Sequence, residues 1–223
     1  MMKKIFKVGI LILTELICIL AFCGCASIKP DEAERYVQAN LDLVFQGETK
    51  EALEFLDASE SDLKRIHIDG IDAFVRTYIA EDMGATSGTA MYHDMVDEVF
   101  SVMKYRIDEA QENGRGKYRV PVIYHPVNLF PSFVEKLKEE AEQIEADAEA
   151  GKYEGTDEEI QTHMLLDYMT HSYGFFEDAY LSMEYGDEET FIFHVKKGEN
   201  GIPELEEEEI QEFIRKIMML DKI

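Results

Sequence analysis

The spacing of the hydrophobic residues changes along this 223-residue chain, and that change limits the folds it can adopt. Up to about residue 100 the apolar residues recur with a helical period. A period of two then follows the turn sequence Glu112-Asn113-Gly114-Arg115, in the alternating residues Tyr118, Val120, Val122 and Tyr124. Helices followed by an antiparallel hairpin favour the α+β class.

Helical spacing predicts helices over 31–46, 49–57, 61–81, 92–100, 131–151, 156–173 and 204–220. Asp31 and Glu34 have the spacing of a capping box, as do Thr156 and Glu159, and Gly47 is expected to end the first helix. Because a proline cannot donate a ladder hydrogen bond, Pro121 predicts an edge strand or a bulge.

A second hairpin is expected from strands over 180–185 and 190–197, turning at Gly186-Asp187. The sequence therefore predicts one α+β domain over residues 31–223. Its antiparallel sheet would consist of two hairpins, with helices packed on one face in a cone-like arrangement.

Charge excludes one class of function. The chain has 47 acidic and 22 basic residues, and a nucleic-acid-binding protein needs clustered Lys and Arg to hold phosphates. Its three cysteines, Cys18, Cys23 and Cys25, all precede the predicted domain, so neither disulfides nor a Cys-ligated zinc site can stabilise that domain. Its stability must come from packing.

The first 25 residues follow the order of a secretory signal: a basic start with Lys3, Lys4 and Lys7, an apolar stretch, and small residues at the end. The end resembles the lipobox of bacterial lipoproteins, with Gly24 before Cys25. The resemblance implies that residues 1–24 are a signal peptide and that Cys25 becomes a lipid-modified N-terminus, anchored at the extracytoplasmic face of the cell membrane. It departs from the usual pattern at Phe22, where Leu is common.

Two alternatives to a lipid anchor remain open. The apolar stretch could be an uncleaved transmembrane anchor, although Lys7 and Glu15 would each cost about 2.5–3.5 kcal/mol at mid-bilayer. It could also be an ordinary secretory signal from which the protein is released.

Cleavage before Cys25 would leave 199 residues with 19 basic and 46 acidic side chains, a formal charge of −27, because residues 1–24 hold three lysines and one glutamate. A short segment, residues 25–30, would tether this acidic body to the membrane. We expect anionic headgroups to repel the body as a whole, so that it stands off the bilayer.

Two segments carry a family resemblance. The segment from Gly47 to Leu56 (GETKEALEFL) resembles the opening of lipoprotein domains related to nuclear transport factor two, and the segment from Phe191 to Gly198 (FIFHVKKG) resembles their last strand and turn. The charged helix pair between them is similar to a Gram-positive lipoprotein family of uncharacterised function. The resemblance implies a cone-shaped α+β domain at the cell surface and supplies no active site. Members commonly carry a Trp after the final Gly, where this chain has Ile202-Pro203.

His163, Asp167 and His171 are the candidate metal ligands. Their spacing of four residues places them within an arc of about 80° on one helix face. The alternative is a solvated helix edge, because two turns of one helix cannot close a metal shell alone. Nothing in the sequence indicates a cofactor.

Tyr168, Tyr173 and Tyr180 are the candidate ligand-binding residues, since tyrosines offer apolar area with a polar tip between the second helix pair and the second hairpin. The alternative is that these aromatic residues are mostly part of the core. His194 is expected on the strand face opposite Phe191, Phe193 and Val195, away from the packed side.

No catalytic residues are assigned. The sequence favours a non-enzymatic binding or interaction module at the cell envelope, whose ligand is a protein or a small molecule. The alternatives are an envelope enzyme with an acid-base or metal site in a cone-shaped pocket, and a structural partner in a larger membrane assembly.

Overall fold

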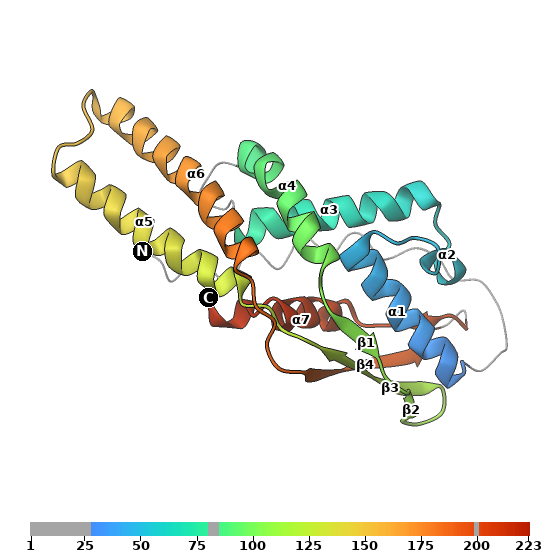
Figure 1. Ribbon diagram of the computed structural model, residues 1–223. Helices are drawn as coiled ribbons and strands as arrows, with labels where there is room; N and C mark the ends of the chain where they lie inside the picture. The colour runs from blue at the N-terminus through green and yellow to red at the C-terminus, as the bar shows by residue number, and fades with distance from the viewer. Residues whose placement is uncertain (1–27, 80–84, 199–200) are drawn as a thin grey trace. The chain divides into compact units, whose positions relative to one another are not determined.

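The computed structural model describes residues 28–79, 85–198 and 201–223 (Figure 1), so the predicted signal peptide and Cys25 lie outside the described residues. The chain divides into two compact units. The first consists of the residues up to Tyr124 together with Glu188–Phe213, and the second consists of His125–Asp187 and Ile214–Ile223.

The first unit is a curled antiparallel sheet with helices, which confirms the α+β class. Its helices are α1 (Pro30–Gln46), α2 (Ala52–Phe55), α3 (Glu60–Tyr78) and α4 (Ala85–Ser101), with the first part of α7 (Glu207–Ile217). Its strands are β1 (Tyr105–Ile107), β2 (Gln111–Glu112), β3 (Lys117–Tyr124), β4 (Glu189–Lys197) and β5 (Pro203–Glu204).

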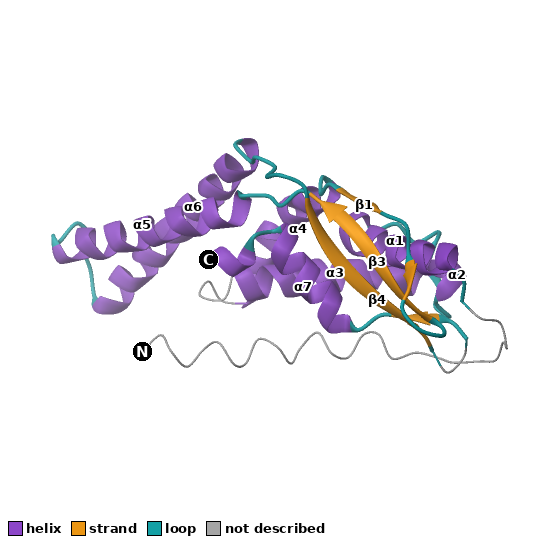
Figure 2. Cartoon of the chain, turned by 90° about the horizontal axis from the view of Figure 1, so that it is seen from below, coloured by secondary structure: helices purple, strands orange, loops and turns teal. Residues whose placement is uncertain are grey.

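The strand order is β1-β3-β4-β5, and β2 pairs with the same edge of β3 as β1 does. In Figure 2 the strands lie in front of α1, α3 and α4, so helices cover one face of the sheet and the other face is open. The inward side chains of β3 and β4 are buried: Tyr118, Val120, Val122, Tyr124, Phe191, Phe193 and Val195.

Phe213 of α7 lies at the centre of the aromatic core. Its ring centroid is 5.2–6.1 Å from the centroids of four other rings, those of Phe45, Tyr124, Phe191 and Phe193. Such pairs add stability beyond the buried area alone. With no cysteine among the described residues, this packing replaces covalent cross-links, as the sequence predicted.

The first predicted hairpin is present. Asn113 N–H donates to the carbonyl of Lys117 at 2.8 Å, and Gly114 and Gly116 take the positive φ angles of 105° and 70° that such a turn needs. Pro121 lies in an inner strand, so the edge-strand alternative is wrong. Its missing N–H causes no loss because it faces the interruption between β1 and β2, where Asp108 N–H donates to the Pro121 carbonyl at 2.8 Å.

The second predicted hairpin differs from the structure. Residues 180 and 181 end a helix, and Tyr185 forms only an isolated bridge with Val127. Strand β4 pairs instead with β3 along eight residue pairs, and with β5 at Lys196 and Lys197. The long β3 gives β4 a complete hydrogen-bonding partner, which the short segment before Gly186 does not offer.

Two helix starts and one helix end test the cap predictions. Thr156 and Glu159 form the predicted capping box, and Gly47 ends α1 with a φ of 64°. The Asp31–Glu34 box is wrong: α1 begins at Pro30 and its N-cap is Lys29, two residues before Asp31, so Pro30 takes the first helical position, where the missing N–H of proline costs nothing.

The second unit contains an antiparallel helix pair, α5 (Leu129–Glu149) and α6 (Asp157–Leu181), which we call the α5–α6 hairpin. Phe176 packs edge-on against Phe130 and Phe133 at the base of this hairpin. None of residues 157–171 is buried, so the first half of α6 stays largely in contact with solvent. The 3-10 helix Leu220–Lys222 contacts α5.

Candidate functional site

The three candidate metal ligands all lie on α6, in the part that buries no residue. The capping box at Thr156 fixes the start of this helix, because the Thr156 side chain accepts from Glu159 N–H and the Glu159 carboxylate accepts from Thr156 N–H at 2.8 Å. His163, Asp167 and His171 then follow at successive turns, as their spacing predicted.

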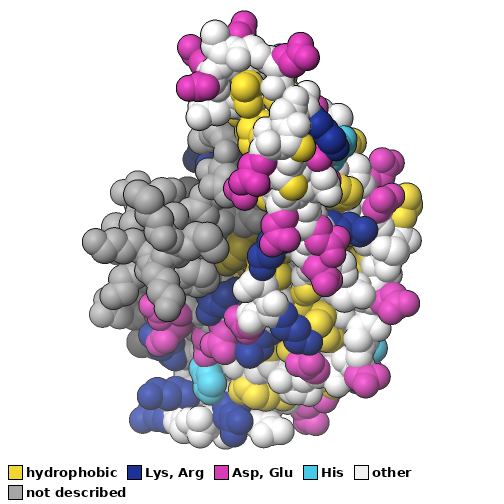
Figure 3. Space-filling view, turned by 90° about the vertical axis from the view of Figure 1, so that its left-hand side faces the viewer, with side chains coloured by type: hydrophobic (Ala, Val, Ile, Leu, Met, Phe, Trp, Pro, Cys, Tyr) yellow, Lys and Arg dark blue, Asp and Glu magenta, His cyan; other side chains and the backbone are white. Residues whose placement is uncertain are grey.

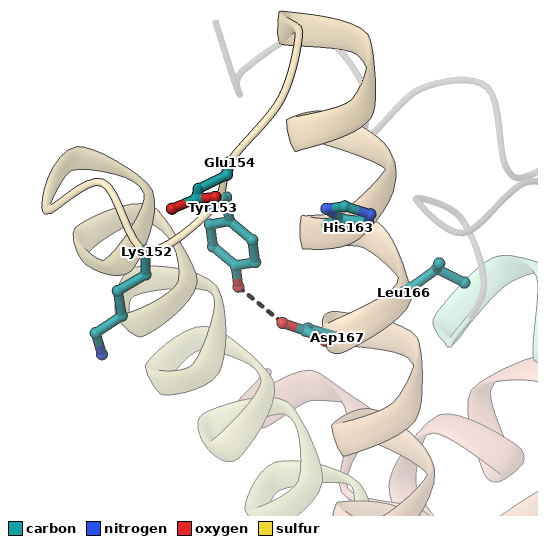
Figure 4. A pocket seen from close by; sticks show the side chains of 6 residues that line it. All are labelled: Lys152, Tyr153, Glu154, His163, Leu166 and Asp167. Atoms are coloured by element: carbon teal, nitrogen blue, oxygen red, sulfur yellow. Dashed lines mark hydrogen bonds between the residues drawn. The ribbon is translucent and has the colours of Figure 1, made fainter.

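An open hollow lies beside the first two of these residues (Figure 4). It is lined by the loop after α5 and by α6, through Lys152, Tyr153, Glu154, His163, Leu166 and Asp167. Tyr153 points from the loop toward α6, and its hydroxyl donates to Asp167 Oδ2 at 3.0 Å. Partial desolvation, followed by this bond to the Asp167 carboxylate, raises the pKa of Tyr153 above its ordinary value.

His171 takes a different partner. Its Nδ1 lies 2.6 Å from Glu140 Oε1 on α5, so it bridges the two helices of the α5–α6 hairpin. The structure therefore brings His163 and Asp167 to one hollow and ties His171 elsewhere. Across the described residues, no group of three or more His, Cys, Asp or Glu side chains is placed to hold a metal ion. The metal site stays a prediction.

The three candidate ligand-binding tyrosines also lie on α6, including Tyr180, which was expected on a strand. Tyr173 is 42% exposed, whereas Tyr168 and Tyr180 are half-buried. At 100° per residue, Tyr168 is about 140° from Tyr173 around the helix, so the two face different sides. None of the three lines the hollow of Figure 4. Their role in binding stays a prediction.

Sequence reasoning missed a pair of reciprocal contacts between α3 and α4. His67 Nε2 lies 3.0 Å from Asp97 Oδ1, and His93 Nδ1 lies 2.7 Å from Asp72 Oδ1. Each helix thus supplies one histidine and one aspartate. The only sequence sign is a histidine followed four or five residues later by an aspartate in both helices, a pattern that has no meaning until the helices are known to pair.

Both nitrogens of His67 have partners, because its Nδ1 lies 3.2 Å from the carbonyl oxygen of Val44. The ring also packs under the Gly47 turn, where a Cβ would come within 3.0 Å of it. These contacts assign His67 a structural role that joins α1, α3 and α4.

His194 lies on the open face of the sheet, as predicted, while Phe191, Phe193 and Val195 are buried. Its Nδ1 and its backbone nitrogen lie 2.6 and 2.9 Å from the two carboxylate oxygens of Glu209 on α7. Glu209 thereby covers the edge of β4 beyond the short strand β5.

Helix α6 exposes three large apolar or aromatic side chains on one face, although the helix itself is acidic. Leu165, Leu166 and Tyr173 are 42–54% exposed, and helical geometry places them within an arc of about 100° on α6. We call these three residues the apolar face of α6. Large exposed apolar groups that share one face mark interaction sites more often than isolated ones do.

Comparison with known proteins shows the fold alone. No family model matches the chain, and no curated protein matches it. Among solved structures, the chain is similar to the crystal structure of the putative lipoprotein YcdA from Bacillus subtilis, with a TM-score of 0.51 and 13% sequence identity. The match covers 84% of this chain and 56% of the Bacillus chain, so this chain spans little more than half of that protein's length.

Over residues 28–79, 85–198 and 201–223, each helix is too short or too polar to span a bilayer.

Proposed function

We propose that this chain is a lipid-anchored protein of the bacterial cell envelope and acts as a non-enzymatic binding module. Three findings support the anchor. The N-terminal sequence has a basic start, an apolar stretch and a Gly-Cys pair at residue 25. The fold is similar to that of the putative lipoprotein YcdA. The terminal segments also resemble lipoprotein domains related to nuclear transport factor two.

The observation that carries the binding proposal is the apolar face of α6. Exposing Leu165, Leu166 and Tyr173 to water costs free energy that contact with a partner would recover. The surrounding helix pair is acidic, which keeps the chain soluble and disfavours non-specific association. We therefore propose the α5–α6 hairpin as the part that contacts a protein partner.

The contacts of the histidines are consistent with a binding module. Four of the histidines, His67, His93, His171 and His194, each have a carboxylate of a neighbouring element within 3.0 Å. Such pairs hold neighbouring elements of the fold together, and a structural role of this kind is consistent with a binding module.

A second candidate function rests on the hollow of Figure 4. There Tyr153 and Asp167 share a hydrogen bond with His163 nearby, so three groups that can exchange protons meet at one hollow. The open form of the hollow favours binding over catalysis, because an enzyme gains from excluding water.

Photo-crosslinking in intact cells tests the binding proposal. A photoreactive residue at Leu166 is expected to give a discrete adduct of higher mass, while one at Leu53, exposed to 39% on α2, is the matched control. Equal yields at both positions, or no adduct at Leu166, would contradict the proposal. The anchor is tested separately by intact mass: a diacylglyceryl-modified Cys25 is expected, and an unmodified N-terminus upstream of it would refute the anchor.

A further inference from the structure

The apolar face of α6 is a second apolar side of a helix that already packs on α5. Phe175 faces α5, since its ring centroid lies 5.8 Å from Lys136 Nζ. At 100° per residue, Leu166 and Tyr173 lie about 180° and 160° around the helix from Phe175. They point away from α5 and are 54% and 42% exposed, so α5 cannot cover this side of α6.

The spacing of this side of α6 fits a helical partner. Leu166, Met169 and Tyr173 follow one another at intervals of three and four residues, which is the spacing of the contact seam between two packed helices. Helical geometry places the three within an arc of about 60°, with Leu165 at its edge. An amphipathic helix is the kind of segment that covers such a stripe along its length.

The charges around the stripe have one sign. Helix α6 has six acidic residues and no Lys or Arg, and across the described residues none of these six carboxylates has an ion pair with a lysine or an arginine. Glu158 precedes Leu165 by about two turns, and Glu177 follows Tyr173 by about one. An exposed carboxylate therefore lies beyond each end of the stripe. Figure 3 views the chain from the side on which Figure 1 draws this hairpin, and acidic side chains lie there beside exposed hydrophobic ones.

The carboxylates at the end of α6 are unfavourably placed in the chain by itself. A helix C-terminus is the negative end of the helix dipole, where cations stabilise and anions destabilise. Asp178 lies in the last turn of α6 and Glu177 directly precedes it, and this turn holds no basic residue. A cationic group of a partner would offset this repulsion.

We infer that the apolar face of α6 binds a basic amphipathic helix of a partner protein. The inference rests on the proposed binding function and specifies the partner. Apolar residues of the partner helix cover Leu166 and Tyr173, and its Lys or Arg residues meet Glu158 and Glu177. Like charge disfavours two other occupants: an anionic membrane surface would be repelled, and a second copy of α6 would bring six more carboxylates to the same contact.

Synthetic peptides of defined charge test this inference. The probe is an amphipathic helix of leucine and lysine. One comparison peptide has glutamate in place of lysine, and the other has the same composition as the probe in an order that gives no apolar side. The protein is the mature chain, residues 25–223, with Cys25→Ser, so that neither lipid nor detergent competes for the peptides. Fluorescence anisotropy of the labelled peptides measures binding.

Of the three peptides, we expect the basic amphipathic one to bind most tightly. Leu166→Gln should weaken its binding roughly ten-fold or more, because a Leu side chain buried in the contact contributes at least that much. Leu53→Gln, at an exposed position of α2, is the control and should leave binding unchanged. Unfolding curves establish that all variants fold.

The carboxylates are tested in the same assay. Glu158→Gln and Glu177→Gln should each weaken binding of the basic peptide by up to about five-fold, and high salt should weaken it because ions screen the attraction. The control combines Glu145→Gln and Glu149→Gln, two exposed positions of α5. This pair changes the net charge as much as the Glu158 and Glu177 pair does, and we expect it to have little effect.

The outcomes separate this inference from the proposed function. Equal binding of the basic and acidic peptides, or no binding of any peptide, would show that the partner is not a basic helix. Equal losses in the two pairs of Glu variants, or no loss in Leu166→Gln, would show that the peptide follows the general charge of the chain and not this face. An adduct at Leu166 in intact cells would still support the binding module in each of these cases, whereas its absence contradicts the proposed function itself.

Discussion

The hydroxyl of Tyr118 donates a buried hydrogen bond of 2.8 Å to the carbonyl of Ile28. This bond fixes the start of the described chain to the beginning of strand β3. The two residues are 90 positions apart, so this bond joins the N-terminal segment to the sheet. Because Ile28 is the fourth residue from Cys25 inclusive, the same bond would determine where a lipid anchor enters the first unit.

Replacing Tyr118 by Phe should lower the free energy of unfolding by about 1–3 kcal/mol, because it leaves a buried carbonyl without a donor while keeping the ring. Chemical denaturation followed by circular dichroism measures the change. Thr190→Ala, at an exposed position of β4, is the control and should stay within about 0.5 kcal/mol of the wild type. Similar small effects of both changes would show that Ile28 is not held by this bond.

Phe213→Ala should be among the most destabilising changes in the first unit, at about 3–5 kcal/mol. Its ring contacts four aromatic neighbours from α1, β3 and β4, and the cavity left behind cannot be refilled by these rigid rings. Thermal and denaturant unfolding both report the loss. Leu53→Ala on α2, exposed to 39%, serves as the comparison, and an equal loss there would disprove a central role for Phe213.

The contact of His93 with Asp72 should appear as coupling in a double-mutant cycle. His93→Gln and Asp72→Asn, alone and together, are expected to give an interaction energy of about 1 kcal/mol, since each single change leaves a partly buried partner behind. A cycle of Asp72→Asn with His163→Gln is the control, because these residues belong to different units. Coupling near zero in the first cycle would mean that the pair does not hold α3 to α4.

Helix α6 should lose stability below about pH 4.3, where the carboxylate of its capping box begins to be protonated. Hydrogen bonds from the backbone and side chain of Thr156 hold the pKa of Glu159 below its ordinary value. The unfolded chain therefore binds this proton more readily. The stabilisation is complete above the ordinary glutamate pKa of about 4.3 and disappears as the pH falls through the lower value of the folded state.

Glu159→Gln should flatten this part of the pH profile of helicity, and Thr156→Ala should cost about 1 kcal/mol at neutral pH. Circular dichroism between pH 7 and pH 2 gives both quantities. The matched control is Glu158→Gln, one position earlier in the same turn. If Glu158→Gln changes the pH profile as much as Glu159→Gln does, the capping role of Glu159 is refuted.

Removal of divalent metal should leave the α5–α6 hairpin unchanged. Asp167 accepts from Tyr153 in the hollow that it shares with His163, and His171 is paired with Glu140, so the three predicted ligands do not meet at one site. We expect the same unfolding midpoint with and without chelator. Zinc retained through purification by the wild type and lost in Asp167→Asn would instead establish the predicted metal site.

Local sequence patterns predicted much of the fold. Gly47 ends α1 and Thr156 with Glu159 begins α6, because caps depend on residues within one turn. The first hairpin was likewise predictable from Asn113-Gly114 and the alternation after it. The capping pattern at Asp31 was misleading, because Pro30 is favoured at the first helical position and the N-cap is therefore Lys29, two residues earlier.

The second hairpin shows where local patterns fail. Residues 180–185 are compatible with a strand, yet the first two of them continue α6 and β4 pairs with β3, more than sixty residues earlier in the chain. Strand pairing is decided by which complete partner is available, and sequence alone does not reveal that partner.

In the candidate site, too, the sequence predicted positions along one helix, whereas the contacts between elements were decided by the tertiary structure. The sequence determined that His163, Asp167 and His171 share one edge of a helix, because helical geometry is fixed. Tertiary packing decided that Asp167 contacts Tyr153 and that His171 contacts Glu140. The reciprocal contacts of His67 and His93 with α4 and α3 depend wholly on two helices lying side by side.

The sequence by itself determined the class of the fold, the caps of its helices, the acidic balance of the body and the Gly24-Cys25 pattern at its start, all of which follow from composition or from neighbours in the chain. Only the tertiary structure decided that Lys117, Arg119, His194 and Lys196 share one face of the sheet, while Tyr118 between them points to the other face and contacts Ile28. These residues come from distant segments, and the pairing of β3 with β4 is the physical event that brings them together.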